Sequence, residues 1–89
     1  MNLEQINKVK QVFRVLNNTT RLRILFLCKE KEMSITEISK KLNLSYTTTS
    51  EYVGMLEYAG LIRKLKKDKE VFVGCLVEIT EDGEIRRKK

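Results

Sequence analysis

The sequence predicts a mainly α-helical domain that carries one small β-hairpin, an α+β fold class. Three observations lead to this prediction. Apolar residues recur at helical spacing over residues 3–16 and again over residues 19–31. Two further short helical patterns, joined by a link of a few residues, fill residues 34–60. Beyond them, apolar and basic residues alternate on both sides of a tight turn at residues 67–69, which indicates two strands.

Composition restricts the function classes open to the chain. Its 89 residues suffice for one domain, residues 1–89, with a single hydrophobic core. Hydrophobic residues make up 42% of the chain and charged residues 34%, a balance typical of folded rather than disordered proteins. There is no apolar run of membrane-spanning length, the N-terminus is polar, and the two cysteines lie far apart. We therefore expect a cytoplasmic protein with no membrane partner and no disulfide framework.

The net charge of +6 is unevenly distributed. Nine of the eighteen Lys and Arg residues lie in residues 61–89, clustered at 63–69 and 86–89. Clustered cations suit a polyanion, because each neutralised phosphate releases condensed counterions. The alternative is a solvated surface that keeps a small protein soluble. The basic tail, residues 84–89, is expected either to add to anion binding or to form a disordered end.

The first helical pattern carries more apolar residues than one core face needs. They are Leu3, Ile6, Val9, Val12, Phe13 and Leu16. We expect one set to face the domain and another a second subunit, so that residues 1–17 contribute to a homodimer interface. Asn18 is expected to cap a second helix from about Thr19 to Lys31. Near its start Arg21 and Arg23 oppose the helix dipole, so we expect a carboxylate or a phosphate to hold them. The alternative for Arg21 is that it packs over the core with a salt bridge.

Residues 34–60 have the signals of two capped helices. Ser34 and Glu37 have the spacing of a capping box, and Asn43 tolerates the left-handed conformation that ends a helix. Ser45 can cap the second helix, and Gly60 can stop it. Two short helices joined by three or four residues describe a helix-turn-helix, whose second helix can enter a DNA major groove.

The C-terminal third predicts strands at Leu61–Lys66 and Glu70–Ile79, separated by the turn at 67–69. Gly74, inside the second strand, suggests a bulge or a close approach of backbone. Thr80–Gly83 could start a last short helix capped by Thr80, but with so few residues left we rather expect this end to fray. The order helix, helix, helix-turn-helix and basic hairpin is that of a winged helix.

Particular phrases within this order resemble one family. TRLRIL at 20–25 and LEYAGLI at 56–62 are similar to the core phrase of ArsR-type winged-helix regulators and to the end of their recognition helix. ITEDG at 79–83 resembles their closing strand-to-helix turn. The resemblance covers most of residues 13–83. It implies a homodimeric, sequence-specific regulator, expected to be a repressor, whose partner is double-stranded DNA.

The candidate contacts follow from the geometry of the helix-turn-helix, in which the first turns of the second helix meet base edges. In this helix the candidates are Ser45, Tyr46, Thr47, Thr48, Ser50 and Glu51, whereas Thr49 and Val53 are expected to point inward. Phosphate contacts are expected from Lys40, Lys41, Lys64, Lys66, Lys67 and Lys69. The alternative is that the hydroxyl groups only cap and solvate the first turn.

Glu51 departs from the resembling family, which often has a basic residue there. A carboxylate facing phosphates is unfavourable. We therefore expect Glu51 to accept from a cytosine amino group, to pair with a cation such as Arg21 or Lys40, or to turn away.

The sequence offers no effector or catalytic constellation. It contains no His, and the helix that begins at Ile35 lacks the paired Cys with which many members of the resembling family hold metal. We therefore expect no metal, no cofactor and no enzyme activity. Cys28 is expected to be a small buried hydrophobe rather than a redox switch, whereas Cys75 is ambiguous, with no basic sequence neighbour to activate it.

A second function class stays open. The second helix of the helix-turn-helix has no Lys or Arg anywhere from residue 45 to 59. The chain could therefore be a winged-helix protein-interaction module in a larger transcription or replication assembly. The salt dependence of binding distinguishes a DNA-binding regulator from a protein-interaction module, because affinity for DNA falls steeply as the salt concentration rises.

Overall fold

The structure, a computed structural model, describes residues 1–88. Lys89, the last residue of the predicted basic tail, lies outside the described residues. The helices are α1 (Leu3–Leu16), α2 (Thr19–Cys28), α3 (Ile35–Leu42) and α4 (Tyr46–Tyr58). The strands are β1 (Met33–Ser34), β2 (Ile62–Lys67), β3 (Glu70–Cys75), β4 (Val77–Ile79) and β5 (Ile85–Arg87). This is the predicted winged helix-turn-helix.

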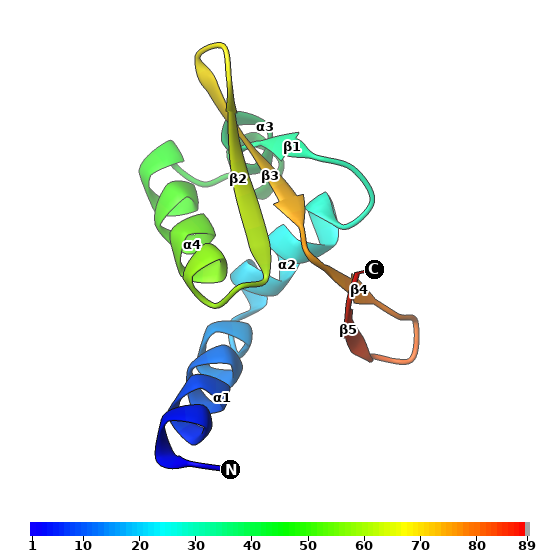
Figure 1. Ribbon diagram of the computed structural model, residues 1–89. Coiled ribbons are helices and arrows are strands. Elements are labelled where there is room, and N and C mark those ends of the chain that lie inside the picture. Colours follow the sequence, from blue (N-terminus) through cyan, green and yellow to red (C-terminus); the bar gives the residue numbers. More distant parts are fainter. Residues whose placement is uncertain (89) are drawn as a thin grey trace.

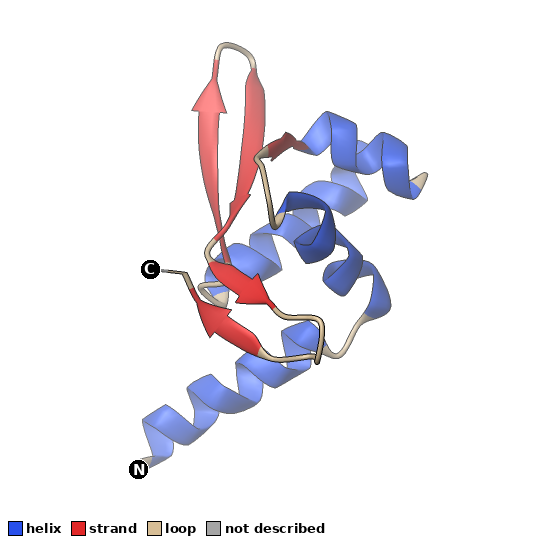
Figure 2. Ribbon diagram, turned by 90° about the vertical axis from the view of Figure 1, so that its right-hand side faces the viewer, coloured by secondary structure: helices blue, strands red, loops and turns tan. Residues whose placement is uncertain are grey.

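The elements form a body from which two arms project (Figure 1). Helices α2, α3 and α4 pack together against an antiparallel sheet in the order β1-β3-β2. The β2–β3 hairpin, which we call the wing, extends beyond this body, and α1 extends from the opposite end in both views (Figure 2). A separate two-stranded sheet, β4–β5, lies to one side.

The core lies between the three helices of the body and the sheet. Its most deeply buried apolar side chains are Ile24, Leu25, Ile35, Ile38, Val53, Leu56, Ile62 and Val73. Thr49 and Val53 of α4 are fully buried, as the sequence predicts. From α1 only Val15 is buried in this core, so most of the first helix is not held by the rest of the domain.

The predicted helix caps are present. Ser34 accepts a hydrogen bond from the Glu37 backbone N–H at 3.1 Å, and the Glu37 carboxylate accepts one from the Ser34 N–H at 3.3 Å. Asn18 caps α2, and Ser45 caps α4. Asn43 has φ 55° and Gly60 φ 79°, the left-handed conformations that end α3 and α4. These caps determine where the helix-turn-helix begins, turns and ends.

Several predicted boundaries are wrong. Helix α2 ends at Cys28, not near Lys31, and the two-residue strand β1 was not anticipated. The first wing strand begins and ends one residue later than predicted, because Lys67 pairs with Glu70 and the turn contains only two residues, Asp68 and Lys69. The second run is interrupted at Leu76. Gly74 forms no bulge, since it pairs with Arg63 in regular register.

The predicted last helix is also wrong. Thr80–Gly83 forms the turn between β4 and β5, in which the Thr80 hydroxyl accepts a hydrogen bond from the Glu84 N–H at 2.9 Å. Gly83 supplies the positive φ of 89° that the turn requires. The basic residues Arg86 and Arg87 therefore lie in a strand that pairs with β4. A Thr cap followed by Gly suits a tight turn as well as a helix start, which explains the error.

Candidate nucleic-acid interface

The first turn of α4 presents polar side chains to solvent. Ser45, Tyr46, Thr47 and Glu51 are exposed, whereas Thr48 and Ser50 are half-buried. The Ser45 hydroxyl accepts from the Thr48 N–H at 3.0 Å and donates to the Thr48 hydroxyl at 3.0 Å. These two hydroxyls therefore already act in the helix cap, as the capping alternative expects. Tyr46 and Thr47 have no such role, so they are the most available of the predicted base-contacting residues.

A stripe of α4 faces away from the core. Thr47, Glu51, Gly54 and Tyr58 recur at intervals of three or four residues, so they share one side of the helix. Behind Thr47 the stripe borders an open cavity of about 480 Å³ against α1, lined by Gln11, Val15, Glu51, Gly54, Met55 and Tyr58. Glu51 thus lies at the edge between the exposed front of α4 and α1.

The pairing of Glu51 with Arg21 or Lys40 is wrong. Within residues 1–88, Glu51 forms no ion pair. Arg21 donates from Nε to the Val15 carbonyl oxygen at 2.6 Å and from Nη2 to the Arg14 carbonyl oxygen at 3.2 Å. Its guanidinium also lies 5.5 Å from the ring centroid of Tyr52. Arg21 therefore satisfies the carbonyls at the end of α1, and neither a carboxylate nor a phosphate is needed to explain it.

The wing lysines fall on two faces of β2, and this alternation separates their surroundings. Lys64 and Lys66 lie on one face, where Lys64 pairs with Glu57 of α4 at 3.3 Å. Lys67 lies on the other face with Arg63, and both donate to the carboxylate of Glu32, at 3.1 and 3.0 Å. Among the described residues Lys66 and Lys69 form no ion pair, so the wing presents two free cations rather than four.

Glu32 was missed by the sequence reasoning. It lies in the loop between α2 and β1, and its contacts to Arg63 and Lys67 span 31 and 35 residues. No local pattern predicts a contact over that separation. A Cβ at Gly74 would lie 3.5 Å from the side chains of Glu32 and Arg63, which is an ordinary van der Waals distance. The close backbone approach predicted at this glycine is therefore wrong, and nothing in the structure requires glycine there.

Lys40 and Lys41 occupy the last turn of α3 and are exposed. Cations at a helix C-terminus interact favourably with its dipole, so these residues have a structural role whether or not they meet phosphate. They precede the turn that leads into α4. The predicted contact residues thus lie on three elements, α3, α4 and the wing.

An apolar stripe on α1 faces solvent. Leu3 is 72% exposed and Phe13 67% exposed, and Ile6 and Val9 complete the stripe. Val12 and Leu16 are half-buried on the side toward the body. The described residues contain no helix with both the length and the apolar character that crossing a bilayer requires. Residues 1–88 contain no cluster of three or more His, Cys, Asp or Glu side chains that could bind a metal ion.

Comparison with known proteins agrees with this geometry. A family model described as winged helix-turn-helix matches residues 20–87. The chain is 33% identical over 76 residues to the transcriptional activator HlyU of Vibrio cholerae, covering 81% of this chain and 70% of HlyU. It is 28% identical over 69 residues to the HTH-type transcriptional regulator KmtR of Mycobacterium tuberculosis, covering 78% of this chain. That match spans about half of the relative, 53% of KmtR.

Solved structures share the fold. Reduced HlyU from Vibrio cholerae superposes with a TM-score of 0.73 at 28% identity, covering 81% of this chain and 76% of HlyU. A homodimeric winged helix-turn-helix DNA-binding domain from Mycobacterium bovis, a possible ArsR-family regulator, has a TM-score of 0.77 at 24% identity. That match covers 81% of this chain and 67% of the other. The predicted resemblance is confirmed: the chain belongs to the winged helix-turn-helix family, and the Mycobacterium bovis structure that shares its fold is described as a possible ArsR-family regulator.

Proposed function

We propose that the chain is a sequence-specific regulator of transcription that binds double-stranded DNA as a homodimer, with α4 in the major groove. The observation that carries this proposal is the exposed first turn of α4, where Tyr46 and Thr47 stand free of the helix cap. A helix-turn-helix places this part of its second helix against base edges. The relatives HlyU and KmtR are named as transcriptional regulators, which supports the same role.

In this proposal the wing binds phosphate rather than bases. Lys66 and Lys69 supply the free cations, and Lys40 and Lys41 add charge beside the turn before α4. Lys64 is paired with Glu57 and Lys67 with Glu32. Each of these lysines contributes to DNA binding only when a phosphate displaces its carboxylate partner. Exposed ion pairs are worth roughly 0–1 kcal/mol, so a phosphate can compete for these lysines.

The homodimer is proposed to form through α1. Helix α1 exposes a continuous row of apolar side chains, Leu3, Ile6, Val9 and Phe13. Exposed apolar patches of this kind mark interaction surfaces in soluble proteins. A second copy would cover it in a two-fold interface, because the same patch serves both subunits. Two copies of α4 related in this way would meet successive major grooves about 34 Å apart on a pseudo-palindrome. We propose repression as the outcome, since bound protein would exclude other proteins from such a site.

The direct test is selection from a library of random duplex DNA at two salt concentrations, followed by sequencing of the bound fraction. A palindromic motif enriched at both salts is the expected result. Salt-sensitive binding without a motif would contradict sequence specificity and leave a nonspecific role. In parallel, light scattering at micromolar concentration should give the dimer mass, and Phe13→Glu should give the monomer mass. Phe26→Glu, at another exposed phenylalanine, is the matched control and should stay dimeric.

A protein-interaction module is the second candidate. Its support is that α4 carries no cation, while Met55 and Tyr58 on its outward side are 45% and 78% exposed. Exposed Met and Tyr side chains are typical of protein interfaces. Absence of DNA binding even at low salt would favour this function over the first.

A further inference from the structure

The fold brings together two cysteines that are far apart in the sequence. Cys28 is the last residue of α2, and Cys75 is the last residue of β3. Both are free and buried. Helix α2 packs on β3, each thiol is the largest influence on the pKa of the other, and Lys88 hydrogen-bonds to the residue after each cysteine, so the two thiols lie close together. A disulfide requires such proximity of the two cysteines. The predicted burial of Cys28 is correct, but its neighbour makes it more than a small apolar side chain.

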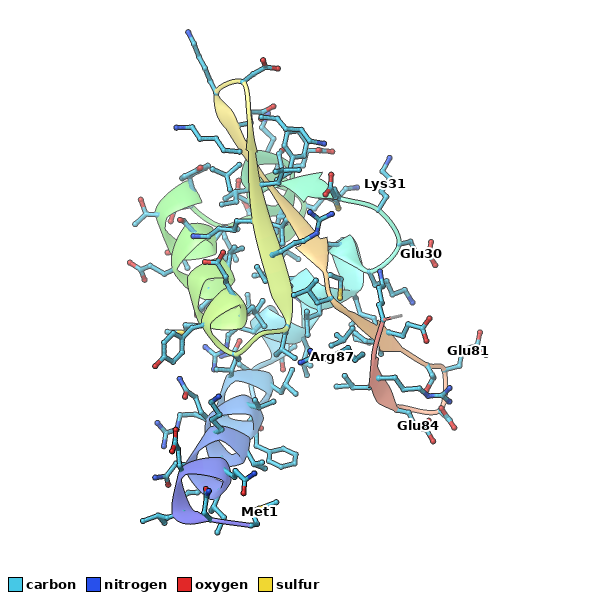
Figure 3. The ribbon with its side chains drawn as sticks, viewed as in Figure 1. Met1, Glu30, Lys31, Glu81, Glu84 and Arg87 are labelled. Carbon is cyan, nitrogen blue, oxygen red and sulfur yellow. The ribbon has the colours of Figure 1, made fainter. Side chains whose placement is uncertain are left out.

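The two thiols differ in access. Cys28 is 1% exposed, whereas Cys75 is 7% exposed and lines an open cavity of about 480 Å³. The other residues lining this cavity are Gly60, Arg63, Leu76, Arg87 and Lys88. Arg87 points from β5 toward the body of the domain (Figure 3). A reagent therefore reaches Cys75 from solvent and meets Cys28 only behind it.

Charge around the cavity favours a thiolate at Cys75. The neighbouring Cys28 thiol lowers the pKa of Cys75 to about 6, and the positive charge of Lys88 acts in the same direction, while burial opposes the shift. The same contact and deeper burial raise the pKa of Cys28. The charged groups that line the cavity are Arg63, Arg87 and Lys88. The Glu32 carboxylate, 3.0 Å from Arg63, partly offsets that cation.

Lys88 is fixed near the thiol pair. Its backbone N–H donates to the Leu76 carbonyl oxygen at 3.0 Å, and its Nζ donates to the Lys29 carbonyl oxygen at 2.7 Å. Lys29 follows Cys28 directly, and Leu76 follows Cys75, so Lys88 bridges the chain beside both cysteines. The ammonium group is held there by the pairing of β5 with β4, which no sequence neighbour of Cys75 would reveal.

We propose that Cys75 and Cys28 form a thiol-modification site for small anionic disulfides, with Cys75 as the attacking residue and Cys28 as the resolving one. The cations at the cavity mouth match the carboxylates of such a reagent, for which glutathione disulfide is the probe. This site is separate from α4 and from the lysines assigned to DNA binding, and it shares only Arg63 with the wing.

The chemistry proceeds in two exchanges. The Cys75 thiolate attacks one sulfur of glutathione disulfide, so a new sulfur–sulfur bond forms, the original one breaks, and one glutathione leaves as a thiolate that takes up a proton. Cys28 then loses its proton to water and attacks the Cys75 sulfur, which breaks the mixed disulfide and releases the second glutathione. Both protein thiols are oxidised to one disulfide, and one glutathione disulfide is reduced to two thiols.

The test incubates the folded chain with glutathione disulfide and measures intact mass. The wild type should lose the mass of two hydrogens and retain no glutathione. Cys28→Ser should retain one glutathione, located at Cys75 by peptide mapping, and Cys75→Ser should retain none. A wild type that reacts only in denaturant, or a Cys75→Ser variant that takes up glutathione at the wild-type rate, would overturn the proposal. Far-UV circular dichroism confirms that each variant is folded, and Cys28→Ala replaces Cys28→Ser if it is not.

Alkylation rates supply a second readout that does not depend on a variant. The reaction of iodoacetamide with wild-type Cys75 should be half-maximal near pH 6, whereas an ordinary cysteine reaches that point near pH 8.5. Lys88→Gln should shift the midpoint upward. Lys31→Gln removes the same charge from the loop after α2, where the side chain points away from the domain (Figure 3), and should leave the midpoint unchanged. A wild-type midpoint near pH 8.5 would show that the thiolate is not stabilised.

Discussion

The carboxylate of Glu32 holds Lys67 of the wing, with 3.1 Å between Oε1 and Nζ. The other oxygen of the same carboxylate accepts from Arg63 at 3.0 Å. Glu32 comes from the loop before β1, so one side chain connects the base of the helix-turn-helix to the wing. It also occupies two cations on the element that is proposed to meet phosphate.

Glu32→Gln should strengthen DNA binding. The change frees Lys67 and Arg63 for phosphate, so affinity should rise for all sequences alike. The dependence of log affinity on log salt should become steeper by about 0.9 for each cation that engages. Fluorescence anisotropy on two unrelated duplexes, at several salt concentrations, measures both quantities.

Glu30→Gln is the control for net charge. Glu30 lies two residues earlier in the same loop, and its side chain points away from the domain (Figure 3). If it raised affinity as much as Glu32→Gln, the effect would come from the overall charge and not from the released wing cations.

Lys66→Gln should weaken binding to every duplex and lower the salt slope by about 1, because a phosphate contact carries no sequence information. Salt titrations of the two variants, Lys66→Gln and Lys31→Gln, make the comparison, since Lys31 carries the same charge away from the wing. An unchanged slope for Lys66→Gln would remove the wing from the proposed interface.

Thr47→Val should change sequence preference instead. Valine keeps the shape of threonine but loses the hydroxyl, so one base position should lose roughly 1–3 kcal/mol of discrimination while the salt slope stays constant. Selection from a random library before and after the change measures this. Thr19→Val, at the exposed start of α2, should leave the selected motif intact. An identical motif for Thr47→Val would mean that this part of α4 does not read bases.

Gly54→Ala should stabilise the fold by about 1 kcal/mol. Glycine is unfavourable within a helix, and no atom lies within 4 Å of the place a Cβ would take. Gly60→Ala should do the opposite, because φ at Gly60 is 79°. Urea unfolding of both variants measures the change in the free energy of unfolding, which should increase for Gly54→Ala and decrease for Gly60→Ala. If Gly54→Ala instead weakened dimerisation, the open space over this glycine would belong to the partner.

Arg21→Gln should destabilise the domain by roughly 1–3 kcal/mol, since hydrogen bonds from the guanidinium to the part-buried Val15 carbonyl and the exposed Arg14 carbonyl are lost. Arg23→Gln is the matched control, because Arg23 is exposed and its side chain forms no hydrogen bond within residues 1–88. Thermal unfolding followed by circular dichroism measures the difference. Equal unfolding midpoints for the two variants would show that the end of α1 needs no side-chain cap.

The sequence predicted the helix-turn-helix well because its determinants are local. Ser34 with Glu37, Asn43, Ser45 and Gly60 act within one helical turn of their own positions. Such short-range hydrogen bonds and φ preferences can be read from neighbouring residues alone. The exposed front of α4 followed from the same local spacing.

The remainder of the site depends on contacts that the chain makes over long distances. Nothing near Lys67 reveals Glu32, and nothing near Cys75 reveals Cys28 or Lys88. The strands β1 and β5 are two and three residues long, too short for an alternating pattern. Thr80–Gly83 was assigned to the wrong element for a different reason, because one set of residues serves both a helix start and a tight turn.

The position of Arg21 has a mechanical consequence. Its guanidinium touches the last carbonyls of α1, the Tyr52 ring and, at 3.3 Å, the sulfur of Met55 on α4. In a dimer joined through α1, the Arg21 side chain would connect the dimerisation helix α1 to the recognition helix α4. A rotation of α1 relative to the body would break the hydrogen bonds of Arg21 and change the distance between the two copies of α4. The rigidity of the contact between α1 and α4 would then determine how much variation in half-site spacing the dimer tolerates.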